Sequence, residues 1–329
     1  MSGARHTGII GVGKYLPEKV LTNADLEKLV DTTDEWIVTR TGIKERRIAK
    51  ENEATSDMAV RAAEKALANA SLKAADLGII IVATITPDMF FPSTACRLQH
   101  KLGVSGIPAF DISVACSGFV YGLAIADSFI KSGLVKYALV VAAEKLSAVT
   151  NWKDRSTCVL FGDGAGAAVL GPVEEGGIMG IHLGADGSKG DLLQMPAGGS
   201  CMPASVHTVE NHLHCIQMEG NILFKHAVKI MGDAAKAVTE PLGLTGEDID
   251  VIIPHQANLR ILEAVAKRMG VDPAKKLYMN LEKYGNMSAA SSAVALCEAV
   301  EEGRITKGKT ILMDAFGGGL TWGALIIKW

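Results

Sequence analysis

Cys116 is the residue of this sequence best placed to act as a nucleophile. It lies in the segment DISVACSG at 111–118, between a predicted strand over 107–113 and a predicted helix over 117–131. The partial positive charge of a helix N-terminus favours a thiolate over a thiol. Small neighbours leave room for a substrate carbonyl, so we expect a reactive cysteine. A buried inert cysteine is the commoner alternative for a single residue of this type.

His255 and Asn286 occupy comparable positions later in the chain. His255 ends a predicted strand over 251–254 in the segment PHQAN, and Asn286 lies in the glycine turn GNMSAAS before a predicted helix over 289–302. Taken singly, they are more simply explained as a loop histidine and a helix cap. If the two halves of the chain pack about a pseudo-twofold axis, both converge with Cys116, which favours a common site.

The segment FGGG at 316–319 follows another predicted strand. Consecutive glycines expose backbone N–H groups, which suit an oxyanion hole. A tight turn with positive φ is the plainer alternative.

The elements that must position these residues alternate along the chain. The first half predicts strands over 7–13, 77–84, 107–113, 137–143 and 159–170 and helices over 33–41, 55–70, 93–102 and 117–131. The second half repeats this order, with strands over 251–254, 277–280, 310–315 and 322–327 and helices over 259–269 and 289–302. Segment 96–104 also resembles 265–271, and FGDG at 161–164 resembles FGGG at 316–319.

The repeated order predicts an α/β fold of two duplicated β-α-β-α-β halves, at 1–175 and 176–329. They would pack about a pseudo-twofold axis in layers α-β-α-β-α. Ligands of such sheets bind beyond the carboxyl ends of the strands, where Cys116 and His255 are expected.

The composition describes an ordinary globular protein. The 329 residues are 48% hydrophobic and 21% charged, with a net charge of −3. This charge argues against a general nucleic-acid or anionic-membrane surface. The sequence shows neither a membrane-length apolar run nor the apolar core of a signal peptide. The chain has six scattered cysteines, at Cys96, Cys116, Cys158, Cys201, Cys215 and Cys297. No two of them form a C-x-x-C pair, which indicates a reducing compartment and a cytoplasmic protein.

The three motifs together resemble the β-ketoacyl-acyl-carrier-protein synthase III family, the initiating condensing enzymes of type II fatty acid synthesis, which have a thiolase-like fold. The resemblance runs from 8–13 to the end of the chain and rests on DISVACSG, PHQANLR and GNMSAAS. The Cys-His-Asn set separates this family from the elongating synthases, which have Cys-His-His. Met287 departs from the threonine that often follows the asparagine.

The resemblance implies a decarboxylative Claisen condensation of a short acyl-CoA primer with malonyl-acyl-carrier protein. The products would be β-ketoacyl-acyl-carrier protein, CoA and CO2. Cys116 would carry the acyl group, His255 and Asn286 would bind the malonyl thioester carbonyl, and the N–H groups of Cys116 and Gly318 would hold the oxyanion. No metal and no cofactor beyond the CoA thioester is implied, and the primer stays open between acetyl, branched and longer acyl groups.

The resemblance also implies binding surfaces. A CoA site is expected at Trp36, Arg40, Thr41, Arg155 and Asn221, with Trp36 and Arg155 enclosing the adenine. Phe91 resembles the residue that reaches across a homodimer to close the partner's acyl pocket. An acidic carrier protein needs a basic patch, and the implied surface comprises Lys225, Gln256, Ala257, Asn258, Leu259, Arg260, Lys267 and Arg268.

Two other functions fit the same residues. An ester-forming or thioesterase-like acyltransferase of this fold would keep Cys116 but would not decarboxylate a malonyl thioester. A non-catalytic carrier-binding subunit would usually lack the cysteine.

Three further patterns are weaker. Leu16 replaces the third glycine that a dinucleotide fingerprint needs after GVG at 11–13. FGDGAG at 161–166 enters a strand and lacks the lysine of a phosphate loop. The residues His207, His212, His214 and Cys215 do not have a standard zinc spacing, so a surface loop is expected there.

Overall fold

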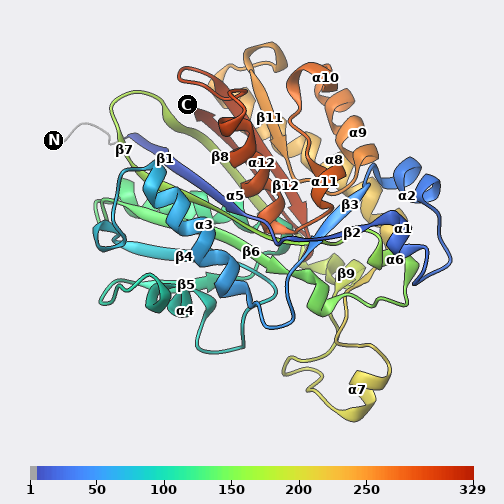
Figure 1. The fold of residues 1–329 in the computed structure, drawn as a ribbon. Helices are drawn as coiled ribbons and strands as arrows, with labels where there is room; N and C mark the ends of the chain where they lie inside the picture. The colour runs from blue at the N-terminus through green and yellow to red at the C-terminus, as the bar shows by residue number, and fades with distance from the viewer. Residues whose placement is uncertain (1–5) are drawn as a thin grey trace.

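The computed structural model describes residues 6–329, and two sheets form its framework (Figure 1). The first sheet is five-stranded in the order β1-β7-β6-β4-β5: β1 (His6–Tyr15), β7 (Asp163–Val173), β6 (Ala138–Lys145), β4 (Ile79–Ala83) and β5 (Ala109–Ile112). The second is four-stranded in the order β11-β12-β13-β8: β11 (Val251–Pro254), β12 (Thr310–Gly317), β13 (Thr321–Lys328) and β8 (Gly177–Ala185).

The two sheets repeat one topology, as the duplication predicts. In the first, β4 is parallel to β6, β7 is antiparallel to β6, and β1 is antiparallel to β7. In the second, β11 is parallel to β12, β13 is antiparallel to β12, and β8 is antiparallel to β13. The division at 175/176 stays a prediction; β7 ends at Val173 and β8 begins at Gly177, on either side of it.

The predicted strand at 277–280 is wrong. Leu277 makes a single parallel bridge to Ile252, at the place that β5 has in the first sheet. The segment leaves the sheet because the Asn280 N–H donates to the side chain of Gln256 (3.0 Å).

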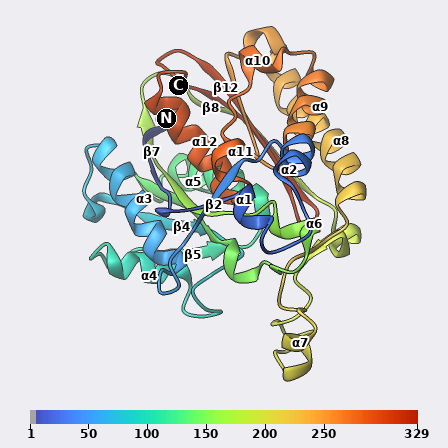
Figure 2. The same ribbon diagram turned by 45° about the vertical axis from the view of Figure 1, so that its right-hand side comes forward.

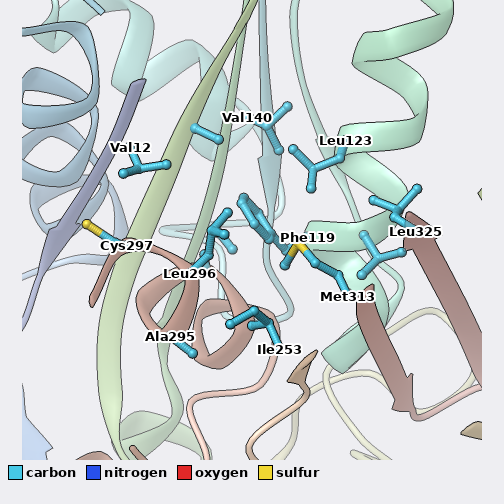
Figure 3. Packing of buried hydrophobic residues seen from close by; sticks show 14 of the residues in the cluster. Val12, Phe119, Leu123, Val140, Ile253, Ala295, Leu296, Cys297, Met313 and Leu325 are labelled. Atoms are coloured by element: carbon cyan, nitrogen blue, oxygen red, sulfur yellow. The ribbon is translucent and has the colours of Figure 1, made fainter. Parts of the chain in front are cut away.

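Helices lie between and outside the sheets. The central layer holds α5 (Gly118–Lys131) and α12 (Ala289–Glu301), whose side chains pack against both sheets. Figure 3 shows Phe119 and Leu296 in this interior, with Val140 from one sheet and Met313 and Leu325 from the other. Residues 289–299 of α12 are all buried, which fits a helix that is apolar or small on every side.

The outer layers complete the predicted order α-β-α-β-α. Helices α3 (Thr55–Asn69) and α4 (Thr94–Lys101) cover the first sheet, and α8 (Gly220–Thr239) and α9 (Leu259–Met269) cover the second. The resemblance of 96–104 to 265–271 is visible in the helix ends, because α4 and α9 are each followed closely by a glycine at φ 71°, Gly103 and Gly270. These glycines stop the helices in a left-handed turn.

Several elements differ from the prediction. Strand β8 and helix α8 lie between the two predicted repeats, where no element is predicted. Strand β7 begins at Asp163, later than the expected 159, because 155–158 form helix α6 (Arg155–Cys158) and Phe161 forms a bridge to Asn286. The predicted helix at 33–41 is confirmed as α2 (Asp34–Thr41).

The remaining strands and α-helices are short: β2 (Lys19–Thr22), β3 (Glu45–Ile48), α1 (Asn23–Leu26), β9 (Leu193–Gln194), α7 (Val206–Glu210), β10 (Gln217–Met218), α10 (Pro273–Lys276) and α11 (Leu281–Tyr284). The segment that carries α7 projects away from the layers (Figures 1 and 2). Within residues 6–329, no helix is both long and apolar enough to cross a membrane.

Candidate active site

Cys116 lies in a tight turn between β5 and α5. The turn is a 3-10 segment, Ala115–Ser117, and Ala115 adopts a positive φ of 45°. Strand β12 passes directly beside it: a Cβ on Gly317 would lie 2.6 Å from the backbone nitrogen of Cys116. Only glycine permits this approach, and the approach places the end of β12 against the sulfur-bearing residue.

Hydrogen bonds fasten the same turn to the start of β13. The Thr321 hydroxyl donates to the Val114 carbonyl (3.0 Å), and the Ser117 hydroxyl donates to the Thr321 carbonyl (3.1 Å). The FGGG turn is therefore tied to the cysteine turn from the other half of the chain. Gly317, which the sequence analysis did not single out, is the glycine that contacts Cys116 directly. The oxyanion role of the Gly318 N–H stays a prediction.

The Cys116 side chain is buried, with 8% of the residue exposed. Burial raises the pKa of the thiol to about 12, and the negative charge of Glu144 adds to this rise. This burial opposes the stabilisation of a thiolate by the helix, which starts only at Gly118. That Cys116 is reactive stays a prediction.

His255 follows the last residue of β11, as predicted. Its backbone N–H donates to the Asp314 carbonyl on β12 (2.7 Å), which continues the parallel ladder by one residue. The residue is 2% exposed, and burial lowers the pKa of the imidazole to about 4. The ring is neutral at physiological pH, so it acts as a hydrogen-bonding group without positive charge.

Asn286 is fixed by its backbone to the segment before β7. Its N–H donates to the Leu160 carbonyl (2.8 Å), and its carbonyl accepts from the Gly162 N–H (3.0 Å). Its side-chain oxygen Oδ1 accepts the N–H of Ser288 (2.8 Å), which leaves Nδ2 as the group that can donate to a ligand.

The neighbouring Met287 is fully buried and packs against Gly164. The departure from the family pattern is therefore accommodated inside the core.

These contacts bring the three predicted residues to one place. Cys116 lies against β12, and the Asp314 carbonyl of the same strand accepts the backbone N–H of His255. On the other side, Ser288 lies beside Cys116, and its N–H donates to the Asn286 side chain. The N-terminal ends of α5 and α12 meet here as well, since a Cβ on Gly118 would lie 3.1 Å from that of Ala289.

Gln256 requires a correction. It is fully buried, and its side chain donates to the carbonyls of Pro254 (2.8 Å) and Tyr278 (3.2 Å) while accepting from Asn280. It cannot present its amide to a carrier protein, and instead holds the loop after His255.

The predicted nucleotide-end residues cluster around Trp36. The guanidinium carbons of Arg40 and Arg155 lie 4.6 and 4.8 Å from the Trp36 ring centroid. Arg155 also donates to the Asp31 carbonyl (2.7 Å). Trp36 and Arg155 are thus in direct cation–π contact and do not leave a gap for a base between them, so the predicted enclosure of adenine requires the Arg155 side chain to move off the indole. Asn221 is exposed in the first turn of α8.

Thr41 is a second correction. The residue is buried, and its hydroxyl donates to the Ile37 carbonyl (2.7 Å) and accepts the Ile43 N–H (3.0 Å). These bonds close the end of α2 and leave the hydroxyl unavailable to a nucleotide.

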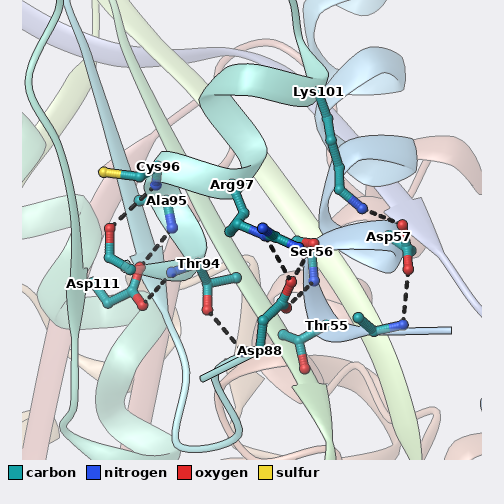
Figure 4. A network of polar contacts seen from close by, with 12 residues as sticks. Thr55, Ser56, Asp57, Asp88, Thr94, Ala95, Cys96, Arg97, Lys101 and Asp111 are labelled. Carbon is teal, nitrogen blue, oxygen red and sulfur yellow. Dashed lines mark hydrogen bonds and ion pairs between the residues drawn. The ribbon is translucent and has the colours of Figure 1, made fainter. Parts of the chain in front are cut away.

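Phe91 is 85% exposed and lies at the tip of a loop with Phe90, which is 80% exposed. The loop is fastened at its base, as Figure 4 shows: the Asp88 carboxylate accepts from the Ser56 N–H (2.8 Å) and hydroxyl (2.6 Å). Two adjacent exposed phenylalanines on an anchored loop are unusual for a surface in contact with water alone.

The predicted carrier surface is only partly available. Lys225, Arg260 and Lys267 are exposed on α8 and α9, whereas Arg268 is exposed but paired with Asp233. Ala257 is half-buried, and Leu259 packs on the core under α9. Asn258 caps α9 by accepting from Arg260 and donates to the Arg40 carbonyl (3.0 Å).

Three polar residues at the site were not predicted: Glu144, Ser288 and Asp314. Glu144, near the end of β6, and Asp314, in the middle of β12, are almost fully buried, and neither carboxylate oxygen of Asp314 has a described partner. Burial raises the pKa of the Asp314 carboxyl well above its usual range. An acidic residue within an otherwise apolar strand is the signal that could have found both. Residues 6–329 contain no cluster of three or more potential metal ligands.

Comparison with known proteins identifies the family. The family model described as 3-Oxoacyl-[acyl-carrier-protein (ACP)] synthase III matches residues 110–187, and the model of its C-terminal part matches residues 240–329. A beta-ketoacyl-[acyl-carrier-protein] synthase III of Caldanaerobacter subterraneus subsp. tengcongensis is 62% identical over 98% of this chain and 97% of its own length. The chain belongs to the β-ketoacyl-acyl-carrier-protein synthase III family.

Other relatives agree with this assignment. A synthase III of Clostridioides difficile is 56% identical over 98% of both chains. The crystal structure of 3-oxoacyl-[acyl-carrier-protein] synthase III from Aquifex aeolicus VF5 is 51% identical, covers 98% of this chain and all of its own, and superposes with a TM-score of 0.91. The thiolase-like fold and the class of condensing acyltransferase follow from this membership.

Proposed function

We propose that this protein condenses a short acyl-CoA primer with malonyl-acyl-carrier protein to give β-ketoacyl-acyl-carrier protein, CoA and CO2, and so initiates fatty acid synthesis. One observation carries the proposal. Asn286 Oδ1 is occupied by the Ser288 N–H, so Nδ2 is left to donate beside a neutral imidazole and a buried thiol.

The first half-reaction transfers the acyl group to Cys116. The sulfur attacks the thioester carbonyl, and the oxyanion forms between the N–H of Cys116 and that of Gly318. Gly317 supports this assignment, because its contact with Cys116 brings the glycine turn alongside the sulfur-bearing residue. CoA leaves, and the acyl-enzyme divides the condensation into two easier steps.

The second half-reaction uses His255 and Asn286 as donors. Loss of CO2 from the malonyl thioester places negative charge on the thioester oxygen, and two neutral donors stabilise that enolate. A neutral imidazole suits this role because it donates without protonating the carbanion. The carbanion then attacks the acyl group on Cys116. No cofactor or metal takes part in this scheme.

The substrate surfaces follow from the exposed residues. Trp36 binds the adenine end of CoA together with Arg155 and Arg40, whose guanidinium groups both contact the indole. Asn221 contacts the pantetheine arm. Lys225, Arg260 and Lys267 dock the acidic carrier protein. Phe91 closes the acyl pocket of a second copy in a homodimer, which accounts for its exposure in one chain. The enzyme acts in the cytoplasm.

The test is product formation with defined substrates. The protein is incubated with a panel of acyl-CoA esters and malonyl-carrier protein, and carrier protein is followed by intact mass. A β-ketoacyl carrier protein two carbons longer than the primer supports the proposal, and the preferred ester names the primer. Transfer of the acyl group to another acceptor without loss of CO2 would favour the acyltransferase alternative.

A further inference from the structure

Glu298 is a buried acid near the C-terminal end of the central helix α12, where the residue is 6% exposed. Its two carboxylate oxygens accept from two side chains of one preceding segment. Oε2 accepts from Asn280 Nδ2 (2.9 Å), and Oε1 accepts from the Tyr284 hydroxyl (2.7 Å). The Lys14 ammonium of β1 lies 3.3 Å from Oε1. Burial alone would raise the pKa of Glu298, but these hydrogen bonds and the charge of Lys14 outweigh it and hold the pKa below its ordinary value.

The two donors to Glu298 bracket the short helix α11. Asn280 stands at the N-cap position of this helix, and Tyr284 is its last residue. Asparagine is among the residues that best cap a helix with their side-chain oxygen. Here the side chain makes no cap bond, its Oδ1 has no described partner, and its amide is turned to Glu298. Asn280 therefore contributes to the contact with α12 and not to the capping of α11.

Helix α11 leads directly into the turn that holds Asn286, with only Gly285 between them. After Asn286, the Met287 N–H donates to the Ser291 hydroxyl (2.8 Å), which belongs to the first turn of α12. Helix α12 therefore holds the segment that carries Asn286 from both sides, through Ser291 near its start and through Glu298 near its end.

Asn280 also joins this segment to the loop after His255. Its backbone N–H donates to the side-chain oxygen of Gln256 (3.0 Å), the residue that follows His255. A chain of hydrogen bonds thus connects the His255 loop with α11 by way of the Glu298 carboxylate. The loops of His255 and Asn286, the two donors assigned to the enolate, are tied to one buried group.

We propose that Glu298 is a positioning residue, which sets the spacing of the His255 and Asn286 donors for decarboxylation of the malonyl thioester. The inference rests on the proposed condensing function and adds to it a residue that acts through these two. Two donors stabilise one developing oxyanion only when both lie at hydrogen-bond distance from it, so a small displacement of one loop weakens the pair. Acylation of Cys116 uses neither donor in this scheme, so it does not depend on Glu298.

Tyr284→Phe removes one hydrogen bond to Glu298 and keeps the aromatic ring that packs in the core. We expect CO2 release from malonyl-carrier protein by the acylated protein to fall about tenfold, while acylation of Cys116 by acyl-CoA stays within about twofold. Asn280→Ala removes the other bond and should have the same selective effect. The matched control is Tyr278→Phe, which removes the hydroxyl of another buried tyrosine that makes no described hydrogen bond to Glu298. It should leave both steps unchanged.

A second readout needs no substrate, so it separates failure of this proposal from failure of the condensing function. Hydrogen exchange of the peptide 280–288 is followed by mass, and Tyr284→Phe should speed it about tenfold, whereas Tyr278→Phe should not. A wild type that releases no CO2 would refute the condensing function itself. With an active wild type, unchanged CO2 release or unchanged exchange in Tyr284→Phe would overturn the role of Glu298, and so would an equal loss of acylation and decarboxylation.

Discussion

Asn286 Oδ1 accepts the backbone N–H of Ser288 at 2.8 Å, and this bond decides which end of the amide faces the substrate. A side-chain amide has one accepting and one donating end. With the acceptor used inside the turn, Nδ2 is the end available to a developing enolate. The turn also brings α12 close to the cysteine turn, since a Cβ on Gly118 would lie 3.1 Å from that of Ala289.

Replacement of Asn286 by aspartate tests the donor assignment. The shape is kept, and Oδ1 can still accept from Ser288, but a carboxylate cannot donate and repels an enolate. We expect decarboxylation of malonyl-carrier protein to fall on the order of a hundredfold or more, measured as CO2 release. Acylation of Cys116 by acyl-CoA should persist. Equal loss of both steps would show that the variant disturbs the whole site.

Gly317→Ala tests the close approach of β12 to Cys116. The new methyl group would lie 2.6 Å from the Cys116 nitrogen, so one of the two backbones must move. We expect a loss of about 1–3 kcal/mol in the free energy of unfolding and a large loss of acyl transfer. Gly199→Ala is the control, because no atom lies within 4 Å of a Cβ there. Wild-type acylation by Gly317→Ala would contradict the described contact.

The lowered pKa of His255 makes stability depend on pH. The native imidazole stays neutral down to about pH 4, whereas the unfolded one protonates below about 6.5. The unfolded state therefore binds more protons in this interval, and stability falls as pH falls from 6.5 to 4. Between pH 7 and 5 we expect the wild type to lose about 2 kcal/mol more than His255→Asn, measured by urea unfolding. Equal losses would place the histidine in a solvated environment.

Arg155→Ala tests the nucleotide end of the CoA site. Removing one guanidinium from the Trp36 face should raise KM for acyl-CoA about tenfold with little change in kcat, because the contact is far from the reacting carbon. Lys153→Ala changes an exposed cation nearby and serves as the control. Both constants are measured by steady-state kinetics with varied acyl-CoA. A fall in kcat with unchanged KM would contradict the assignment of Arg155 to the CoA-binding site.

Arg260→Glu tests the carrier surface. Its reversed charge should lower kcat/KM for malonyl-carrier protein about tenfold, with a weaker salt dependence, and leave acylation by acyl-CoA unaffected. Lys73→Glu introduces the same negative charge at an exposed position that follows α3, on the outer layer of the other sheet, and should have little effect. A similar loss in both variants would indicate a general charge effect instead of docking.

The sequence was most informative where residue type and position at a strand end coincide. Cys116 and His255 follow predicted strands and Asn286 lies in the glycine turn before a predicted helix, and the repeated order of elements predicted the two matching sheets. It was least informative about side-chain direction. Gln256 and Thr41 belong to segments that resemble binding motifs, yet their polar groups turn inward to close backbone turns.

The missed acids have a different cause. Glu144 and Asp314 lie in apolar strands, and only the packed structure shows that both are buried without an ion pair among the described residues. The burial of the Cys116 thiol could not be predicted for a related reason, because desolvation depends on the whole fold, whereas the helix effect can be inferred from local sequence.

The most direct test of the condensing function is a single turnover starting from isolated acyl-enzyme. The protein is loaded with radiolabelled acetyl-CoA or another accepted ester, freed of CoA, and mixed with malonyl-carrier protein while intact mass follows both proteins. The label should leave Cys116 and appear in β-ketoacyl-carrier protein with release of one equivalent of CO2. An adduct on another residue, or one that stays on Cys116 in the presence of malonyl-carrier protein, would contradict the function proposed here.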